Sequence, residues 1–189
     1  MRSRRKSREA ALCVLYSLDL QREGVDIDEA SELALSELTL SPDQVAYTHR
    51  LIKGVMGDLS EIDETIKRFL NDYDIDRVAA VDRTLLRMAV YELYHEPGLA
   101  PAISINEAVE LAKKYSTAAS GKFVNGVLGA LVKESPKAIW DPSTAPAETE
   151  VVEEPEAAPE PENEETVVEG SDEGQQAIQF GWKIRTDAP

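Results

Sequence analysis

Apolar residues recur with helical spacing along the first 133 positions, and no segment there shows the alternation of a β-strand. Glycines, prolines and capping residues separate the periodic stretches and predict where helices begin and end. The predicted helices span residues 3–23, 26–38, 41–57, 58–71, 76–97, 104–115 and 118–133. Their short connections predict an all-α fold, a compact bundle of about seven helices in two subdomains. The subdomains are expected to meet near residues 38–58 or 71–76.

Two helix starts carry a full capping box. Ser41-Pro-Asp-Gln44 combines a capping serine, a proline at the first helical position and a glutamine that can bond back. Ser104-Ile-Asn-Glu107 repeats the reciprocal pattern and predicts a start at residue 104. The last predicted helix contains Gly126 and Gly129, which cost about 1 kcal/mol each relative to alanine. We expect a close helix crossing to compensate.

Charge divides the chain near Trp140. Residues 1–140 contain 18 basic and 22 acidic residues, whereas residues 141–189 contain 2 and 14. The second part is rich in Pro, Ala and Glu, so it cannot bury enough apolar surface to offset the entropy of ordering. We therefore predict one helical domain over 1–140 and a disordered acidic tail over 141–189. Within the tail, residues 178–184 alternate apolar and polar side chains, which fits either a short strand or a partner-binding motif.

Signals for catalysis or cofactor binding are weak. The chain has no Gly-rich phosphate loop between a strand and a Lys-Ser/Thr ending. His49 and His95 are the only histidines, and the single Glu92-Leu-Tyr-His95 is half of what a helical di-metal site needs. Cys13 is the only cysteine, which excludes an intrachain disulfide. No run reaches the roughly 18 apolar residues of a membrane span. We predict a cytoplasmic protein with no enzymatic activity, cofactor or metal.

Five cations and no acid occupy the first eight residues, namely Arg2, Arg4, Arg5, Lys6 and Arg8. They lead directly into the first predicted helix, so a rigid helix end would present their charge. Lysines and arginines bind phosphate backbones with release of counterions, and arginine does so bidentately. This segment, residues 4–8, is called the basic entry below, and its charge favours RNA or DNA binding. The alternative is a solvated terminus whose charges bind nothing specific.

Three segments, in this order, resemble the NusB family of transcription antitermination factors. They are the basic entry continuing to Leu15-Tyr-Ser17, the stretch Leu86-Arg-Met-Ala-Val-Tyr-Glu-Leu93, and residues 105–128 with INEAVELAK and KFVNGVL. The resemblance covers about residues 4–134. It implies an all-α fold of two subdomains and no catalytic activity. It also implies binding to the boxA sequence of nascent ribosomal RNA jointly with NusE, a small-subunit ribosomal protein, so that RNA polymerase reads through terminators.

The resemblance assigns RNA contacts to two places. The basic entry matches the family's arginine-rich segment through Arg4, Arg5, Lys6 and Arg8. Lys122 and Phe123 fall where the family also touches RNA. Lys122 suits a phosphate near a helix N-terminus, and Phe123 suits either stacking on a splayed base or core packing.

The resemblance also places Tyr16 and Asp82 at positions that face NusE. Tyr16 alternatively reads as a half-buried core tyrosine, and Asp82 as a first-turn acid that favours the helix dipole. Two features depart from the family pattern. Ala118-Ala119 occupies a turn where relatives often carry an acid, and the acidic extension is longer than usual. Anionic residues of that extension could compete with RNA for the basic entry at low salt.

Two rival functions remain open from the sequence. One is a protein-binding adaptor whose basic entry docks an acidic partner without recognising RNA sequence. The other is an accessory module for RNA modification, because a similar helical domain precedes a methyltransferase domain in some ribosomal RNA enzymes. No methyltransferase domain follows in this chain.

Overall fold

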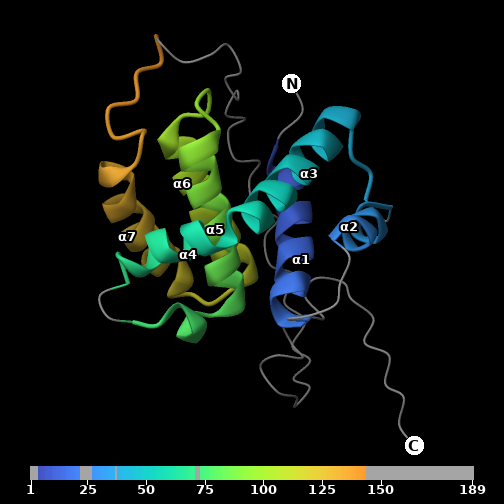
Figure 1. The fold of residues 1–189 in the computed structure, drawn as a ribbon, viewed down its shortest axis with the longest axis horizontal. Helices are drawn as coiled ribbons and strands as arrows, with labels where there is room; N and C mark the ends of the chain where they lie inside the picture. The colour runs from blue at the N-terminus through green and yellow to red at the C-terminus, as the bar shows by residue number, and fades with distance from the viewer. Residues whose placement is uncertain (1–3, 22–26, 37, 71–72, 144–189) are drawn as a thin grey trace, which may run out of the picture. The chain divides into compact units, whose positions relative to one another are not determined.

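The computed structural model describes residues 4–21, 27–36, 38–70 and 73–143, all within one compact unit (Figure 1). These residues form seven α-helices and two single 3-10 turns, with no strand among them, which confirms the predicted all-α class. The elements are α1 (Arg5–Gln21), α2 (Ile27–Ser36), α3 (Pro42–Gly57), α4 (Leu59–Lys67), η1 (Ile75–Arg77), α5 (Ala80–His95), α6 (Pro101–Tyr115), α7 (Ser120–Leu131) and η2 (Val132–Glu134). The predicted tail lies outside the described residues from position 144 onward, and so does the 178–184 motif.

Helix α5 is the centre of the bundle. It packs against α1, α3, α4, α6 and α7, and every residue from Val81 to Leu93 is buried. Helices α1, α2 and α3 pack on one another, as do α5, α6 and α7. Contacts of α1 and α3 with α5 join these two groups. Helix α4, which follows α3 directly at Asp58, packs on both α3 and α5 and so lies between the two groups.

The start of α3 confirms the predicted capping box. The Gln44 backbone N–H donates to Ser41 Oγ at 3.4 Å, and Gln44 Oε1 accepts from the Ser41 backbone N–H at 2.9 Å. Pro42 occupies the first turn, where its missing N–H costs nothing. At the other end, Asp58 is both the C-cap of α3 and the N-cap of α4, so the two helices join without a loop.

The predicted start of α6 at Ser104 is wrong. The helix begins one turn earlier, with Ala100 as N-cap and Pro101 in the first turn, because the ring of proline presets a helical φ. Ser104 is consequently buried inside the helix, and its hydroxyl has no hydrogen-bond partner among the described residues. Glu107, the other half of the predicted box, binds Arg5 instead.

The prediction of a close crossing at Gly126 and Gly129 is also wrong. A Cβ atom added at either glycine would meet nothing within 4 Å. The close approaches lie elsewhere. A Cβ at Gly54 would lie 2.1 Å from the ring of Tyr91, so α3 crosses α5 with no room for a side chain there. A Cβ at Gly121 would lie 2.8 Å from Cγ of Lys113.

Candidate nucleic-acid interface

Three cations of the basic entry lie at the surface where α1 begins. Arg5 makes a two-bonded pair with Glu107 of α6, with Nε to Oε2 at 3.0 Å and Nη2 to Oε1 at 2.7 Å, and its side chain remains 39% exposed. The guanidinium carbon of Arg4 lies 4.6 Å from the centre of the Tyr47 ring. Lys6 is exposed. The contacts of Arg4 and Arg5 hold their guanidinium groups in place at this helix end, where the sequence predicted a concentration of positive charge.

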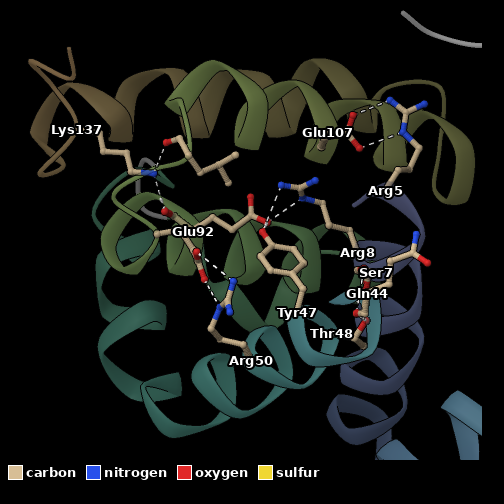
Figure 2. Close-up of polar contacts among 12 residues, drawn as sticks. Arg5, Ser7, Arg8, Gln44, Tyr47, Thr48, Arg50, Glu92, Glu107 and Lys137 are labelled. Atoms are coloured by element: carbon tan, nitrogen blue, oxygen red, sulfur yellow. Dashed lines mark hydrogen bonds and ion pairs between the residues drawn. The ribbon is translucent and has the colours of Figure 1, made fainter. Parts of the chain in front are cut away.

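Arg8 has a different place from the other three. Its side chain is only 4% exposed, and its Nε donates to Oε1 of Glu92 at 2.8 Å (Figure 2). Its Nη2 also donates to the hydroxyl of Tyr47 at 3.4 Å, and that hydroxyl donates to Glu92 at 2.6 Å. Arg8 therefore anchors α1 to α3 and α5. Its burial weighs against a direct RNA contact, which stays a prediction.

Glu92 also holds the C-terminal end of the described chain. Lys137 is buried, and its Nζ donates to the backbone carbonyl of Glu92 at 2.9 Å and to that of Leu99 at 2.6 Å (Figure 2). Burial lowers the pKa of Lys137 to about 8, against the opposing effect of the Glu92 and Glu96 carboxylates. Glu92 therefore binds Arg8 through its side-chain carboxylate and Lys137 through its backbone carbonyl.

Sequence reasoning missed Tyr47 and Glu92. Tyr47 belongs to no local motif, Glu92 was considered only as half of a metal motif and as part of the family segment, and their shared partner Arg8 lies 39 and 84 residues away from them. The neighbouring polar residues Ser7 and Thr48 were a weak signal in the sequence, since both also join α1 to α3. Ser7 Oγ donates to the carbonyl of Gln44 at 3.1 Å, and Thr48 Oγ1 donates to the carbonyl of Ser7 at 3.3 Å.

Lys122 and Phe123 lie in the first turn of α7. Lys122 is exposed, and Phe123 is half-buried, a placement that fits stacking on a base and core packing alike. The side chain of Lys113 lies across Gly121 at the start of the same helix. Helix α6 thus connects this place with the start of α1, because Lys114 near the end of α6 pairs with Glu9 of α1 at 2.9 Å.

The two residues predicted to face NusE lie on α1 and α5. Tyr16 is half-buried on α1. Asp82 is 6% exposed in the first turn of α5, and its Oδ2 accepts from Ser120 Oγ at 2.8 Å. Its Oδ1 is buried without a hydrogen-bond partner among the described residues. These placements agree with the structural readings of both residues and leave their role toward a partner as a prediction.

The C-terminal half of α1 joins α5 through a second set of charges. Asp19 accepts from Arg83 and from Arg87, the latter at 2.7 Å, and Arg87 binds both oxygens of Asp63 at 2.7 and 2.8 Å. Burial raises the pKa of Asp19, but the hydrogen bonds from the two arginines outweigh it and hold the pKa below its usual value. A cavity of about 240 Å³ lies beside these groups, bordered on its apolar side by Leu15.

Among the residues that the structure describes, no cluster of three or more His, Cys, Asp or Glu side chains could hold a metal ion. None of the described helices is long and apolar enough to cross a membrane. The thiol of Cys13 is half-buried, and burial raises its pKa to about 11, which keeps it protonated and unreactive at neutral pH.

Comparison with known proteins adds independent findings. The model of the NusB family matches residues 5–133. A transcription antitermination protein NusB of Symbiobacterium thermophilum is 40% identical over 139 residues, covering 69% of this chain and 90% of that protein. The solved structure of T. maritima NusB superposes with a TM-score of 0.68 at 38% identity, covering 72% of this chain and 96% of the other. A crystal structure of the antitermination factors NusB and NusE in complex with dsRNA superposes with a TM-score of 0.64 at 34% identity, covering 69% and 96%.

Proposed function

This chain belongs to the NusB family, and we propose that it binds boxA-type nascent ribosomal RNA together with NusE. Its function is transcription antitermination, that of the named relatives, and it is not an enzyme. Binding of the RNA and NusE places the chain in the antitermination complex of RNA polymerase, where it promotes read-through. Such a complex forms on nascent transcripts, so we assign the chain to the cytoplasm.

One observation supports the RNA site above others, namely the exposed charge of the basic entry at the first turn of α1. Contacts with α3 and α6 direct Arg4 and Arg5, Lys6 is exposed beside them, and Arg8 fixes the helix below them. Cations held in place lose little side-chain entropy when a phosphate binds, and each contact releases counterions. Lys122 adds a cation at the N-terminus of α7, where the helix dipole also favours an anion.

The proposed partner site uses Tyr16 and Asp82. Support comes from a solved NusB relative that is in complex with NusE and RNA. The helices that carry the two residues are joined just beside them, since Asp19 of α1 pairs with Arg83 of α5. A phenol that is half-buried still offers an edge to a partner. Asp82 would act through its carboxylate, which Ser120 already orients.

The proposed domain organisation is a helical RNA-binding domain over residues 1–140 and an acidic tail over 141–189. The family match ends at residue 133, which agrees with a domain boundary soon afterwards. Twelve of the sixteen net negative charges come from the 2 basic and 14 acidic residues of the tail. This charge would oppose RNA binding at low salt by competing for the basic entry.

The proposal is tested by removing the exposed charge of the basic entry while Arg8 stays. The variant Arg4→Ala, Arg5→Ala, Lys6→Ala is expected to bind a boxA-like RNA more weakly than the native chain. The log–log salt slope should become shallower by roughly 0.7 for each single-strand phosphate that the variant no longer neutralises. The matched control removes three exposed cations elsewhere, through Lys67→Ala, Arg68→Ala and Arg77→Ala.

Equal RNA affinity in the entry variant and the control, with normal helicity in both, would reject the basic entry as the RNA site. A scrambled RNA separates the rival adaptor function, because an adaptor would bind neither RNA with a sequence preference. Tyr16→Asp tests the partner site and should weaken NusE association more than direct RNA binding. A stable Tyr16→Asp variant with normal NusE affinity would remove Tyr16 from the proposed interface.

A further inference from the structure

Three arginines lie over the ring of Tyr47 in α3, namely Arg4 just before α1, Arg8 in α1 and Arg50 in α3 itself. The guanidinium carbon of Arg4, in the basic entry, lies 4.6 Å from the centre of the ring, and that of Arg50 lies 5.0 Å from it. Both distances are within the range of a cation–π contact. Tyr47 itself is only 2% exposed. Arg4 and Arg50 therefore cover the buried ring on the side that faces the surface of the protein.

The Tyr47 ring is fixed in orientation. The Tyr47 hydroxyl donates to Oε1 of Glu92 at 2.6 Å, and the same carboxylate oxygen accepts from Arg8 at 2.8 Å (Figure 2). Glu92 is 2% exposed on the fully buried part of α5. A ring held at its far end by a buried carboxylate cannot rotate freely. The two arginines above it are thus placed relative to each other by the core.

One edge of the Arg50 guanidinium is bound by an acid, and nearly half of the side chain is exposed. Its Nε and Nη2 donate to Glu96 at 2.6 and 3.4 Å, which engages a single edge of the planar group. The side chain of Arg50 is 44% exposed, whereas that of Glu96 is 12% exposed. The acid is therefore the inner partner and the guanidinium the outer one. An oriented, exposed guanidinium suits a phosphate oxygen better than a freely rotating ammonium does.

We propose that Arg50 is a further RNA-contacting residue, placed beside Arg4 by the shared Tyr47 ring, so that the RNA surface continues from α1 onto α3. This inference rests on the proposed RNA binding of the basic entry and extends it by one helix. Tyr47 is then a positioning residue, since it is buried and acts through the arginines above it. Nothing in the sequence pattern of α3 marks Arg50, because its neighbour Arg4 lies 46 positions earlier.

The test compares Arg50→Ala with Arg77→Ala. Arg77 is a matched control because it too is an exposed arginine over a tyrosine ring, 5.3 Å from the centre of Tyr73. Arg50→Ala should weaken binding to a boxA-like RNA and make the log–log salt slope shallower by about 0.7, the value for one single-strand phosphate that is no longer neutralised. Arg77→Ala should leave both quantities unchanged. All titrations are run well below the melting temperature of each variant.

A second variant separates an RNA contact from a purely structural ion pair. Glu96→Gln removes the competing carboxylate and keeps Arg50, so RNA affinity should rise. If Arg50 only ties α3 to the end of α5, both variants should lower the melting temperature and leave RNA affinity unchanged, and the inference is overturned. Normal RNA binding by Arg50→Ala beside weak binding by the entry variant would overturn it alone. A native chain that binds no RNA would instead overturn the proposed function and this extension together.

Discussion

Ion pairs join both ends of α1 to α5, and the signs of the charges on the two helices are reversed between the two ends. Near its N-terminus α1 supplies the cation Arg8 and α5 the acid Glu92, whereas near its C-terminus α1 supplies the acid Asp19 and α5 the cations Arg83 and Arg87. The two helices therefore run antiparallel. Arg8, Asp19, Arg83 and Glu92 each have the sign that the dipole of their own helix end disfavours, whereas Arg87 lies in the middle of α5. The partner helix neutralises each of these charges, which lets α1 begin with a run of cations.

The two ends differ in their access to water. The side chains of Arg8 and Glu92 are 4% and 2% exposed, while those of Asp19, Arg83 and Arg87 are 10 to 11% exposed beside a cavity of about 240 Å³. The first is a dry pair with one carboxylate at its centre, and the second is a shared network with Asp63 as a further acid. Loss of a charge should consequently cost more at the first end than at the second.

The largest effect is expected from Glu92→Leu. Removal of this carboxylate leaves the Arg8 guanidinium buried beside apolar atoms and removes the acceptor of the Tyr47 hydroxyl. Loss of one partner of a buried pair destabilises a protein by about 3–5 kcal/mol, and we expect the free energy of unfolding to fall by that amount. Urea denaturation followed by far-UV circular dichroism measures it.

The control for this prediction is the double variant Arg8→Met, Glu92→Leu. Replacement of both members of a buried pair by apolar residues is often nearly neutral. The double variant should therefore recover much of the stability that Glu92→Leu alone loses. A single variant that loses less than about 1 kcal/mol, the range of an exposed pair, would show that the Arg8 end is not the drier one.

A smaller loss is expected from Asp19→Ala, because Arg87 keeps Asp63 and water can reach the network. We expect the free energy of unfolding to fall by about 1–3 kcal/mol, the cost of leaving charged hydrogen-bonding groups unsatisfied. The pKa of Asp19 is lowered in the folded state, so its contribution is present above the unfolded pKa and is lost as the pH falls through the folded pKa. The native chain should thus lose stability below about pH 4 more steeply than the variant does. Equal acid dependence in both chains would contradict this assignment.

A third effect, confined to alkaline pH, is expected at Lys137. Its folded pKa is about 8, below the value of 10.5 for an ordinary lysine. Between these values the unfolded chain binds the proton and the folded chain does not, so the stability of the native chain should rise with pH. Lys137→Met removes this rise. Denaturation of both chains at about pH 7.5, below this window, and at about pH 9.5, inside it, measures the difference, and parallel curves would count against it.

The smallest effect is expected from Arg5→Ala. Its pair with Glu107 has ideal two-bonded geometry, but the Arg5 side chain is 39% exposed. Exposed pairs contribute about 0–1 kcal/mol, so the melting temperature should hardly change although the RNA affinity should fall. This variant separates surface charge that serves binding from buried charge that serves folding. A loss of stability equal to that of Glu92→Leu would remove the distinction between the two.

Local signals predicted the fold where the deciding groups lie close together in sequence. The capping box at Ser41 was confirmed because both of its hydrogen bonds close within four residues. The same type of pattern at Ser104 does not mark a helix start, because Pro101 sets the start of α6 one turn earlier. Glu107 instead binds Arg5, which lies 102 positions away in the sequence, and no local pattern reveals such a partner. The family resemblance was confirmed because it draws on segments across most of the domain.

The candidate site was predictable in its charge but not in its depth. A count of cations identified the basic entry, yet it could not separate Arg8 from Arg4, Arg5 and Lys6. The separation depends on Glu92, which lies 84 positions from Arg8 and inside the most buried helix. A heptad or capping rule describes neighbours on one helix, whereas this pair joins two. The roles of Lys122, Phe123, Tyr16 and Asp82 stay predictions.

The contact between Gly54 and Tyr91 restricts which sequences can share this fold. A methyl group at position 54 would lie 2.1 Å from the Tyr91 ring, so alanine there requires either a shift of α3 or a smaller residue at position 91. A larger residue at position 54 is therefore tolerated only with such a compensating change. A single base change that replaces Gly54 starts a lineage at a disadvantage, and a later change at position 91 can restore it. Substitution histories across the family should show these positions changing in that paired order.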